Sequence, residues 1–324
     1  TRHLTNSGIP TQGIAFYHQS TLDLLQGLSC SVGLRYDYEH ARCDFSKVQQ
    51  PLNGNGETKS LEQFNRSLHF GQFTPRFSMQ YLSSHNQLFY ASVSKGYKAG
   101  GFNVSFLNND DYLYSPEYNW NYEIGTKLSF LNNRLSADLS LFYIDWRNQQ
   151  ITNTIPTVGN VIRNAGRSRN KGIEASFQAR PTKSWMMYMN YGYTDARFVH
   201  YQKEERGILK DYEGNYLPMV PRHTFSLTTG YSFYDICSWI DRLTLNAGVS
   251  VTGPIYWYED NQAKQSPYAL VNLRISINKG CFTWEAWSKN LTNTDYLSYY
   301  FVTSKAYAQK GKPITLGTSV SISL

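Results

Sequence analysis

Three clusters of aromatic residues stand in polar segments of the sequence, where side chains could meet a ligand. Tyr offers a large, rigid apolar face and a hydroxyl group that can reach polar groups of a bound molecule. The same residue types also line the boundary between lipid and water in membrane proteins. The sequence therefore predicts either binding or anchoring for these clusters, which are Tyr112, Tyr114 and Tyr118; Tyr256, Trp257 and Tyr258; and Tyr296, Tyr299, Tyr300 and Phe301.

The densest basic segment of the chain contains Arg163, Arg167, Arg169 and Lys171. A group of positive charges in a narrow opening would attract an anionic ligand. The alternative is a solvated strand whose charges make no contact with a ligand. Elsewhere the 31 basic residues are spread along the chain, and no recognised nucleic-acid-binding fold accompanies the net charge of +7. We therefore expect no nucleic acid as a partner.

Residues for catalysis or metal binding do not occur at useful spacing. The four cysteines lack the C-x₂₋₄-C spacing of a structural zinc site, and the seven histidines form no H-x-H or i,i+4 pair. His200 is the most attractive candidate for an exposed ligand to haem iron. No G-x-S-x-G elbow, P-loop or dinucleotide fingerprint is present. We expect no enzyme and no resident metal ion.

Two-faced strands make up most of the chain. In Leu28–Glu39, apolar residues alternate with residues that include Arg35, Asp37 and Glu39, so all charges fall on one face. Similar alternation predicts an all-β, antiparallel fold of about 13 strands, with LNNR at 131–134 as a hairpin turn. The expected strands cover 13–23, 28–39, 67–82, 87–97, 120–130, 135–143, 171–180, 184–196, 222–233, 242–253, 268–278, 281–290 and 312–324.

The connections between these strands alternate between short and long. The segment 41–66 is predicted to be a long polar connection, with Cys43 inside it, whereas 83–86 is a tight turn. A transmembrane β-barrel has this arrangement, with short periplasmic turns, long extracellular loops and a wet interior. The mean hydropathy of −0.49 fits a soluble protein equally well. A soluble β-sandwich remains an alternative, although it gives no reason for every second loop to be long.

The expected strand directions indicate an incomplete barrel. The last strand, 312–324, follows a long connection and so runs toward the periplasm; counting back, the first strand runs inward too. Bacterial single-chain barrels have an even number of strands and start in the periplasm. We therefore expect residues 1–324 to be one incomplete domain, the C-terminal portion of a larger barrel.

Several sequence segments, taken in their order along the chain, resemble those of TonB-dependent outer-membrane receptors. They are YASVSKGYKAGGFN (90–103), SPEYNWNYEIGTK (115–127), LSLFYIDWRNQQI (139–151), NAGRSRNKGIEASF (164–177), VPRHTFSLTTGY (220–231), NLTN (290–293) and the terminal GKPITLGTSVSISL. The resemblance covers almost the whole chain and is strongest to the siderophore-receptor branch. The family usually ends on an aromatic residue, whereas this chain ends on Leu324.

The resemblance implies a barrel of about 22 strands filled by a plug domain, and the plug has no counterpart in this chain. It implies uptake of a ferric siderophore or similar iron chelate, with haem, cobalamin or a glycan as alternative ligands. The implied partners are the TonB complex, acting through the plug, and the lipid and lipopolysaccharide of the outer membrane. No intrinsic cofactor is implied, because the ferric chelate is cargo. A passive porin or a surface adhesin is the alternative from another class.

On this reading, ligand contacts come from the extracellular loops and the upper wall. The residues predicted to make them are Tyr112, Tyr114, Tyr118, Tyr256, Trp257, Tyr258, Tyr299, Tyr300, Arg163 and Arg167. For each aromatic residue the alternative is packing at the lipid boundary. For the arginines the alternative is a solvated strand whose charges pair with carboxylates of the plug or with lipopolysaccharide phosphates.

Overall fold

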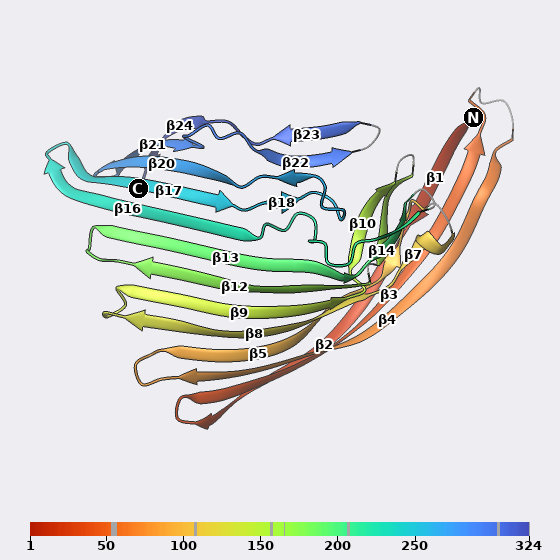
Figure 1. The fold of residues 1–324 in the computed structure, drawn as a ribbon, viewed down its shortest axis with the longest axis horizontal. Coiled ribbons are helices and arrows are strands. Elements are labelled where there is room, and N and C mark those ends of the chain that lie inside the picture. Colours follow the sequence, from red (N-terminus) through yellow and green to blue (C-terminus); the bar gives the residue numbers. More distant parts are fainter. Residues whose placement is uncertain are drawn as a thin grey trace.

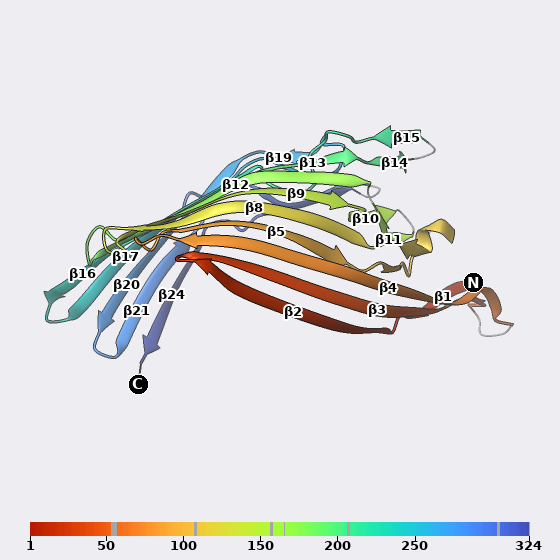
Figure 2. The ribbon, with the colours of Figure 1, turned by 90° about the horizontal axis from the view of Figure 1, so that it is seen from below.

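The computed structural model describes residues 1–52, 57–106, 109–155, 158–164, 166–205, 208–302 and 305–323. Most of their strands form one curved antiparallel sheet with the shape of a trough (Figures 1 and 2). Leu324, the last residue of the expected terminal strand, lies outside the described residues. No helix in the described ranges is long and apolar enough to cross a membrane.

Fourteen strands form the wall of the trough, in the order β1-β3-β4-β5-β8-β9-β12-β13-β16-β17-β20-β21-β24, with β2 also paired to β3. They are β1 (Arg2–Gly8), β2 (Thr11–Leu25), β3 (Leu28–Gln50), β4 (Lys59–Leu82), β5 (Leu88–Lys98), β8 (Glu117–Phe130), β9 (Leu135–Arg147), β12 (Arg167–Ala179), β13 (Trp185–His200), β16 (His223–Cys237), β17 (Ile240–Thr252), β20 (Tyr268–Lys279), β21 (Phe282–Lys289) and β24 (Thr315–Ile322).

The predicted antiparallel β fold is confirmed, and each of the 13 expected strands coincides with a wall strand. The 14 wall strands occupy 13 positions, because β1 and β2 pair with successive parts of β3 and share one position. β1 itself was not expected from the sequence. The described strands form an open sheet whose outermost members are β1 and β2 on one side and β24 on the other.

Every turn at one end of the wall is short. The six short connections have two to five residues. In the turn after β8, the successive residues Leu131, Asn132 and Asn133 have φ values of 54°, 54° and 63°. Asn adopts this left-handed conformation more readily than most residues, so the hairpin predicted at LNNR is confirmed.

The other end of the wall carries long connections with secondary structure of their own. They hold four hairpins and one short two-stranded ribbon, none of which was expected from the sequence. These elements are β6 (Gly101–Phe102), η1 (Asn109–Tyr112), β7 (Leu113–Tyr114), β10 (Gln150–Ile155), β11 (Gly159–Asn164), β14 (Gln202–Glu205), β15 (Ile208–Asp211), β18 (Ile255–Tyr256), β19 (Lys264–Gln265), β22 (Leu297–Val302) and β23 (Ala306–Lys310).

The predicted loop at 41–66 is wrong for most of its length. β3 continues to Gln50 and β4 begins at Lys59, and the two strands pair beyond the rest of the wall (Figure 1). In this extension Cys43 is buried, with 1% of its surface exposed, rather than lying in a loop. Ala41, Cys43 and Phe45 pack with Phe102 under the connection after β5. The alternation of Ala41, Cys43 and Phe45 was the sequence signal for this strand.

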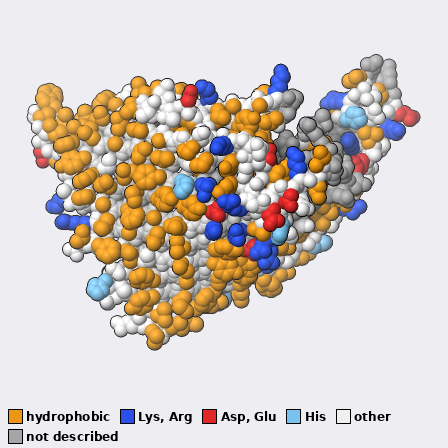
Figure 3. All heavy atoms as spheres, viewed as in Figure 1, with side chains coloured by type: hydrophobic (Ala, Val, Ile, Leu, Met, Phe, Trp, Pro, Cys, Tyr) orange, Lys and Arg blue, Asp and Glu red, His pale blue; other side chains and the backbone are white. Residues whose placement is uncertain are grey.

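The two faces of the wall differ as the sequence predicts. Leu34 and Tyr38 on β3, and Leu139 and Leu141 on β9, are large apolar residues with 39–54% of their surface exposed. They lie on the convex face, which is covered by apolar side chains in Figure 3. Arg35 and Asp37 alternate with them and lie on the concave face, where they form an ion pair. Exposed apolar rows of this kind fit contact with lipid.

This assignment predicts opposite outcomes for neighbouring residues at the middle of β9. Leu141→Arg places a charge against lipid and should lower the free energy of unfolding in bilayers by about 2–4 kcal/mol. Ser140→Arg, on the concave face, serves as the matched control and should change it far less. Denaturant titration of the membrane-inserted protein measures both. Equal losses for the two variants would show that the faces are assigned incorrectly.

Candidate functional site

The long connections fold against one another at the end of the trough and form two blocks. The first block contains the connections after β5 and β9, together with the extension of β3 and β4. The second contains the connections after β13, β17 and β21. Ile151 of β10 packs against the apolar cluster of Phe198, Tyr201, Tyr212 and Leu217 in the second block. The candidate residues are therefore held by packed structure rather than by isolated loops.

Paired amide side chains join the two connections of the first block. Asn103 donates from Nδ2 to the carbonyl oxygen of Ile162 (2.8 Å), and its Oδ1 accepts from the Ile162 backbone N–H (2.8 Å). Asn164 and Ser115 make the same reciprocal arrangement, at 2.8 and 2.9 Å. Each Asn imitates a strand partner, so two connections distant in sequence behave as one unit.

Arg163 fastens this block with a bidentate ion pair. Its Nε and Nη2 atoms donate to Oδ1 and Oδ2 of Asp111 at 2.7 and 2.6 Å, and only 11% of the Asp111 side chain is exposed. Two parallel charge-assisted bonds fix both the distance and the orientation of the groups. Arg163 therefore positions the connection after β5, through a carboxylate of this same chain that the sequence did not indicate as its partner.

Tyr112 and Tyr114 lie within the first block. The Tyr112 ring is 5.4 Å from the Phe64 ring, centroid to centroid, and the guanidinium of Arg66 lies 5.2 Å from its centroid. A side chain added at Gly101 would collide with the Tyr114 ring, so Gly101 is needed for this close approach. Burial raises the pKa of Tyr114. Both tyrosines serve the packing of the block.

A stacked aromatic pair joins two connections of the second block. The rings of Tyr256 and Tyr216 are 5.4 Å apart and nearly parallel, at 7°. The guanidinium groups of Arg197 and Arg222 lie 4.0 and 4.9 Å from the Tyr216 centroid. Cations over an aromatic face are attracted by its quadrupole. The cluster ties the connection after β17 to the end of β13.

Trp257, Tyr258, Tyr299 and Tyr300 form the contact between the last two connections. Trp257 is 6% exposed, and its ring lies 6.4 Å from Tyr299 and 6.5 Å from Tyr300. Tyr258 accepts a hydrogen bond at its hydroxyl oxygen from the backbone N–H of Val302 (2.6 Å). Burial raises the pKa of Tyr258, against the opposite effect of that hydrogen bond. Tyr299 remains 42% exposed.

Two polar atoms near these surfaces are buried and find no hydrogen-bond partner among the described residues. They are Nε1 of Trp257 and the hydroxyl oxygen of Tyr97. An unsatisfied buried polar group costs about 1–3 kcal/mol. Each atom can therefore gain from a ligand or water that supplies a partner.

Tyr118 and Arg167 belong to wall strands and lie in their outward rows, on the convex face. Tyr118 is opposite Arg147 on β9, and Arg167 is opposite Arg147 from the other side. Lys95 lies 5.3 Å from the Tyr118 centroid, and Arg167 donates to Asp145 at 2.5 Å. For Tyr118 this position favours the lipid-boundary alternative.

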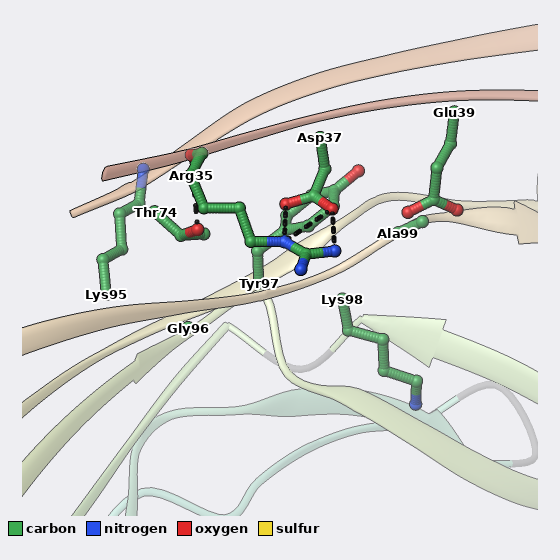
Figure 4. A pocket seen from close by; sticks show the side chains of 9 residues that line it. All are labelled: Arg35, Asp37, Glu39, Thr74, Lys95, Gly96, Tyr97, Lys98 and Ala99. Atoms are coloured by element: carbon green, nitrogen blue, oxygen red, sulfur yellow. Dashed lines mark hydrogen bonds and ion pairs between the residues drawn. The ribbon is translucent and has the colours of Figure 1, made fainter. Parts of the chain in front are cut away.

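A charged hollow that the sequence did not predict lies where residues of β3, β4 and β5 meet. It measures about 600 Å³ and is lined by Arg35, Asp37, Glu39, Thr74, Lys95, Gly96, Tyr97, Lys98 and Ala99 (Figure 4). Arg35 donates through Nε (2.9 Å) and Nη2 (2.6 Å) to Asp37, and Lys98 lies 3.9 Å from Glu117. Glu39 makes no ion pair within the described ranges. The alternation in Leu28–Glu39 predicted that Arg35, Asp37 and Glu39 share one face of a strand. It could not predict that residues of β5 lie beside them.

Possible metal ligands do not gather among the described residues, where no group of three or more His, Cys, Asp or Glu side chains could hold an ion. His200, the candidate for a haem contact, lies 3.5 Å from Glu213. Nothing in the geometry therefore supplies a resident metal centre in the part of the chain that the structure describes.

The curated relatives of this chain are named as receptors. It is 24% identical to the pesticin receptor of Yersinia pestis, over 99% of this chain and 45% of that protein. It is 26% identical to the probable TonB-dependent siderophore receptor PiuA of Acinetobacter baumannii, over 69% of this chain and 30% of that protein. The chain thus spans less than half the length of these curated relatives.

Solved structures show the same fold. The ferric yersiniabactin uptake receptor FyuA of Yersinia pestis superposes with a TM-score of 0.80 at 21% identity, over 99% of this chain and 47% of that one. PiuA of Acinetobacter baumannii gives a TM-score of 0.76 at 20% identity, over 96% of this chain and 42% of that one. The family model described as "TonB dependent receptor-like, beta-barrel" matches residues 3–293. This chain belongs to the TonB-dependent receptor β-barrel family of the bacterial outer membrane.

Proposed function

We propose that the protein containing this chain imports a ferric siderophore or similar iron chelate across the outer membrane, with energy from the TonB complex. The observation that carries this proposal is the wall itself, which matches the family's barrel and carries folded loop blocks at one end only. The names of PiuA and FyuA, which refer to siderophore and ferric yersiniabactin uptake, support the ligand class.

The architecture suits a protein that binds a ligand at its loops and then lets it pass along the inside of the wall. Antiparallel strands form a rigid wall whose concave face is polar, so a hydrated ligand can move along it. The two loop blocks stand at the extracellular end, because long connections lie outside in such barrels. This arrangement calls for binding and release rather than bond chemistry, and we propose a transporter without enzymatic activity. The TonB complex would act through a plug domain, and the ferric chelate would be cargo rather than a cofactor.

The second block is the best candidate for ligand contact. The indole N–H of Trp257 has no hydrogen-bond partner among the described residues, and the neighbouring Tyr299 is exposed. Planar, electron-rich rings of this kind suit the apolar and aromatic parts of an iron chelate. Within the predicted set, Arg163, Tyr112 and Tyr114 would position the first block. Tyr256, Trp257, Tyr258, Tyr299 and Tyr300 would form the binding surface.

Dependence on TonB provides a direct test of the transport function. Cells that rely on this receptor should grow under iron limitation when a suitable ferric siderophore is supplied, and growth should stop when TonB is removed. Growth on excess free iron is the control, because it bypasses the receptor. Uptake that continues at an unchanged rate without TonB would instead support the passive-porin alternative.

Truncating Trp257 should damage the second block. Trp257→Ala removes contacts with Tyr299 and Tyr300, and truncation of buried Trp costs about 3–5 kcal/mol. We expect at least a tenfold loss of ligand affinity and faster proteolysis in the connection after β17. Trp239→Ala is the matched control, because Trp239 lies in a short turn at the opposite end and is 82% exposed. Ligand titration and limited proteolysis measure both effects; identical behaviour of the two variants would contradict a role for this block.

A further inference from the structure

The short turns of the wall, which face the periplasm in such barrels, border a hollow that the proposed function leaves unused. This periplasmic hollow measures about 630 Å³ and is lined by the turns after β8 and β12 and by parts of β13, β16 and β17. Its lining residues Ser232 and Tyr234 alternate with Tyr231 and Phe233, which are exposed apolar residues of the convex face. The hollow therefore lies on the concave side, where a ligand would leave the barrel.

Three cations line the periplasmic hollow, and the described residues supply no counter-charge for them. They are Arg134 in the turn after β8, and Arg180 and Lys183 in the turn after β12. All three residues are exposed, and no ion pair is found for any of them in the part of the chain that the structure describes. No Asp or Glu is among the described residues that line the hollow. Its positive charge is therefore uncompensated.

Backbone hydrogen bonds hold these cations close to one another. The N–H of Arg180 donates to the carbonyl oxygen of Arg134 (2.7 Å), which joins the turns after β8 and β12. The N–H of Ser232 donates to the carbonyl oxygen of Ser184 (2.8 Å), so the turn after β12 is also fixed to β16. Figure 1 shows both turns at the end of the wall opposite β10 and β14. The fold itself thus gathers the three like charges.

Two cations on other inward rows of the wall do have carboxylate partners. Arg35 is paired with Asp37 at 2.6 Å, and Arg274 lies 3.9 Å from Glu285. In the periplasmic hollow the described lining residues other than the cations are all neutral. Unpaired like charges on a concave surface concentrate a positive potential and attract an anion. An anion bound there would also relieve the repulsion among the cations.

The neutral lining indicates an organic anion rather than a simple inorganic one. The amide groups of Asn132 and Asn246 line the same hollow as the cations and can bind polar groups of a ligand. Tyr234 and Trp185 add two aromatic side chains. The volume of about 630 Å³ is in the size range of small-molecule sites. An anion with polar and aromatic parts fits this lining better than phosphate does.

We propose that the periplasmic hollow is an exit site, which binds an anionic ferric chelate as the chelate leaves the barrel. A ferric chelate is an anion when the negative charge of its oxygen ligands exceeds the charge of the iron. The loop blocks bind it at the opposite end of the wall, so the two sites act in sequence. Because the cations are exposed, salt screens them and the chelate can leave again. This inference rests on the proposed transport function and adds the charge of the cargo to it.

Iron uptake by cells that carry the full-length receptor tests the exit site. The triple variant Arg134→Gln, Arg180→Gln, Lys183→Gln removes the three charges. We expect its affinity for an anionic chelate at the cell surface to stay unchanged, because the loop blocks are intact, and its maximal uptake rate to fall about tenfold. The probes are radioactive ferric complexes of a tricatecholate and a tricarboxylate, which are anions, and of a trihydroxamate, which is uncharged. Surface binding and periplasmic accumulation are measured for each probe.

Two control receptors separate charge from folding. The variant Arg134→Lys, Arg180→Lys, Lys183→Arg keeps the three charges and should import the anionic probes at the unaltered rate. Lys279→Gln is the matched control at the same end of the wall, because Lys279 pairs with Asp241 at 2.7 Å and does not line the hollow. Its uptake should equal that of the unaltered receptor. Unchanged surface affinity in all variants shows that each of them is folded and inserted.

Several outcomes would overturn the exit site. Anionic probes imported at an unchanged rate by the triple Gln variant, or a loss shared by the charge-keeping variant, would show that the charges do not act in release. Import of the trihydroxamate alone by the unaltered receptor would show that the cargo is not an anion. Slower uptake together with TonB-independent entry of a large antibiotic would assign the cations to holding a plug. Absence of TonB-dependent uptake from every probe would contradict the proposed function and the exit site together.

Discussion

The wall of this protein depends on an unbroken ladder of backbone hydrogen bonds between antiparallel strands. Lipid offers no partner to a peptide group, so each wall strand must satisfy its donors and acceptors on its neighbours. That requirement forces strict alternation of side chains, with Leu141 toward lipid and Ser140 toward the interior. The polar lumen and the apolar belt are therefore two results of the same backbone constraint.

The wall was predictable from the sequence because period-two alternation is a local property, and it recurs in every strand that meets lipid. The extension of β3 and β4 was not predicted, because the pattern of apolar residues outside and polar residues inside does not hold there. Beyond the membrane the convex side becomes wet, while Ala41, Cys43 and Phe45 turn toward a covering loop. In the sequence, the only sign of this inversion is the short alternation of Ala41, Cys43 and Phe45 at the start of a polar stretch.

The contacts of the loop blocks could not be predicted, because they join residues far apart in the chain. Asn103 imitates a strand partner of Ile162, and Tyr258 receives the N–H of Val302. Residue type indicated that Arg163 would be charged and important, but not that Asp111 would hold it. The alternation of faces along a strand could have distinguished Tyr118 and Arg167 from the loop residues, because it places both side chains on the outward face of the wall. Contact with ligand stays a prediction for all ten residues.

The height of β3 and β4 has a further consequence for the cell surface. β4 has 24 residues, and crossing the bilayer takes about 9–11 of them. At roughly 3.3 Å per residue, the remaining residues span on the order of 40 Å along the strand, and less along the membrane normal because the strands of such barrels tilt by about 45°. A ribbon of this length projects from the membrane surface. Antibodies and other large soluble molecules therefore meet it before they reach the lumen. Paired strand, and not a loose loop, thus carries this region of the surface as far as Gln50 and Lys59.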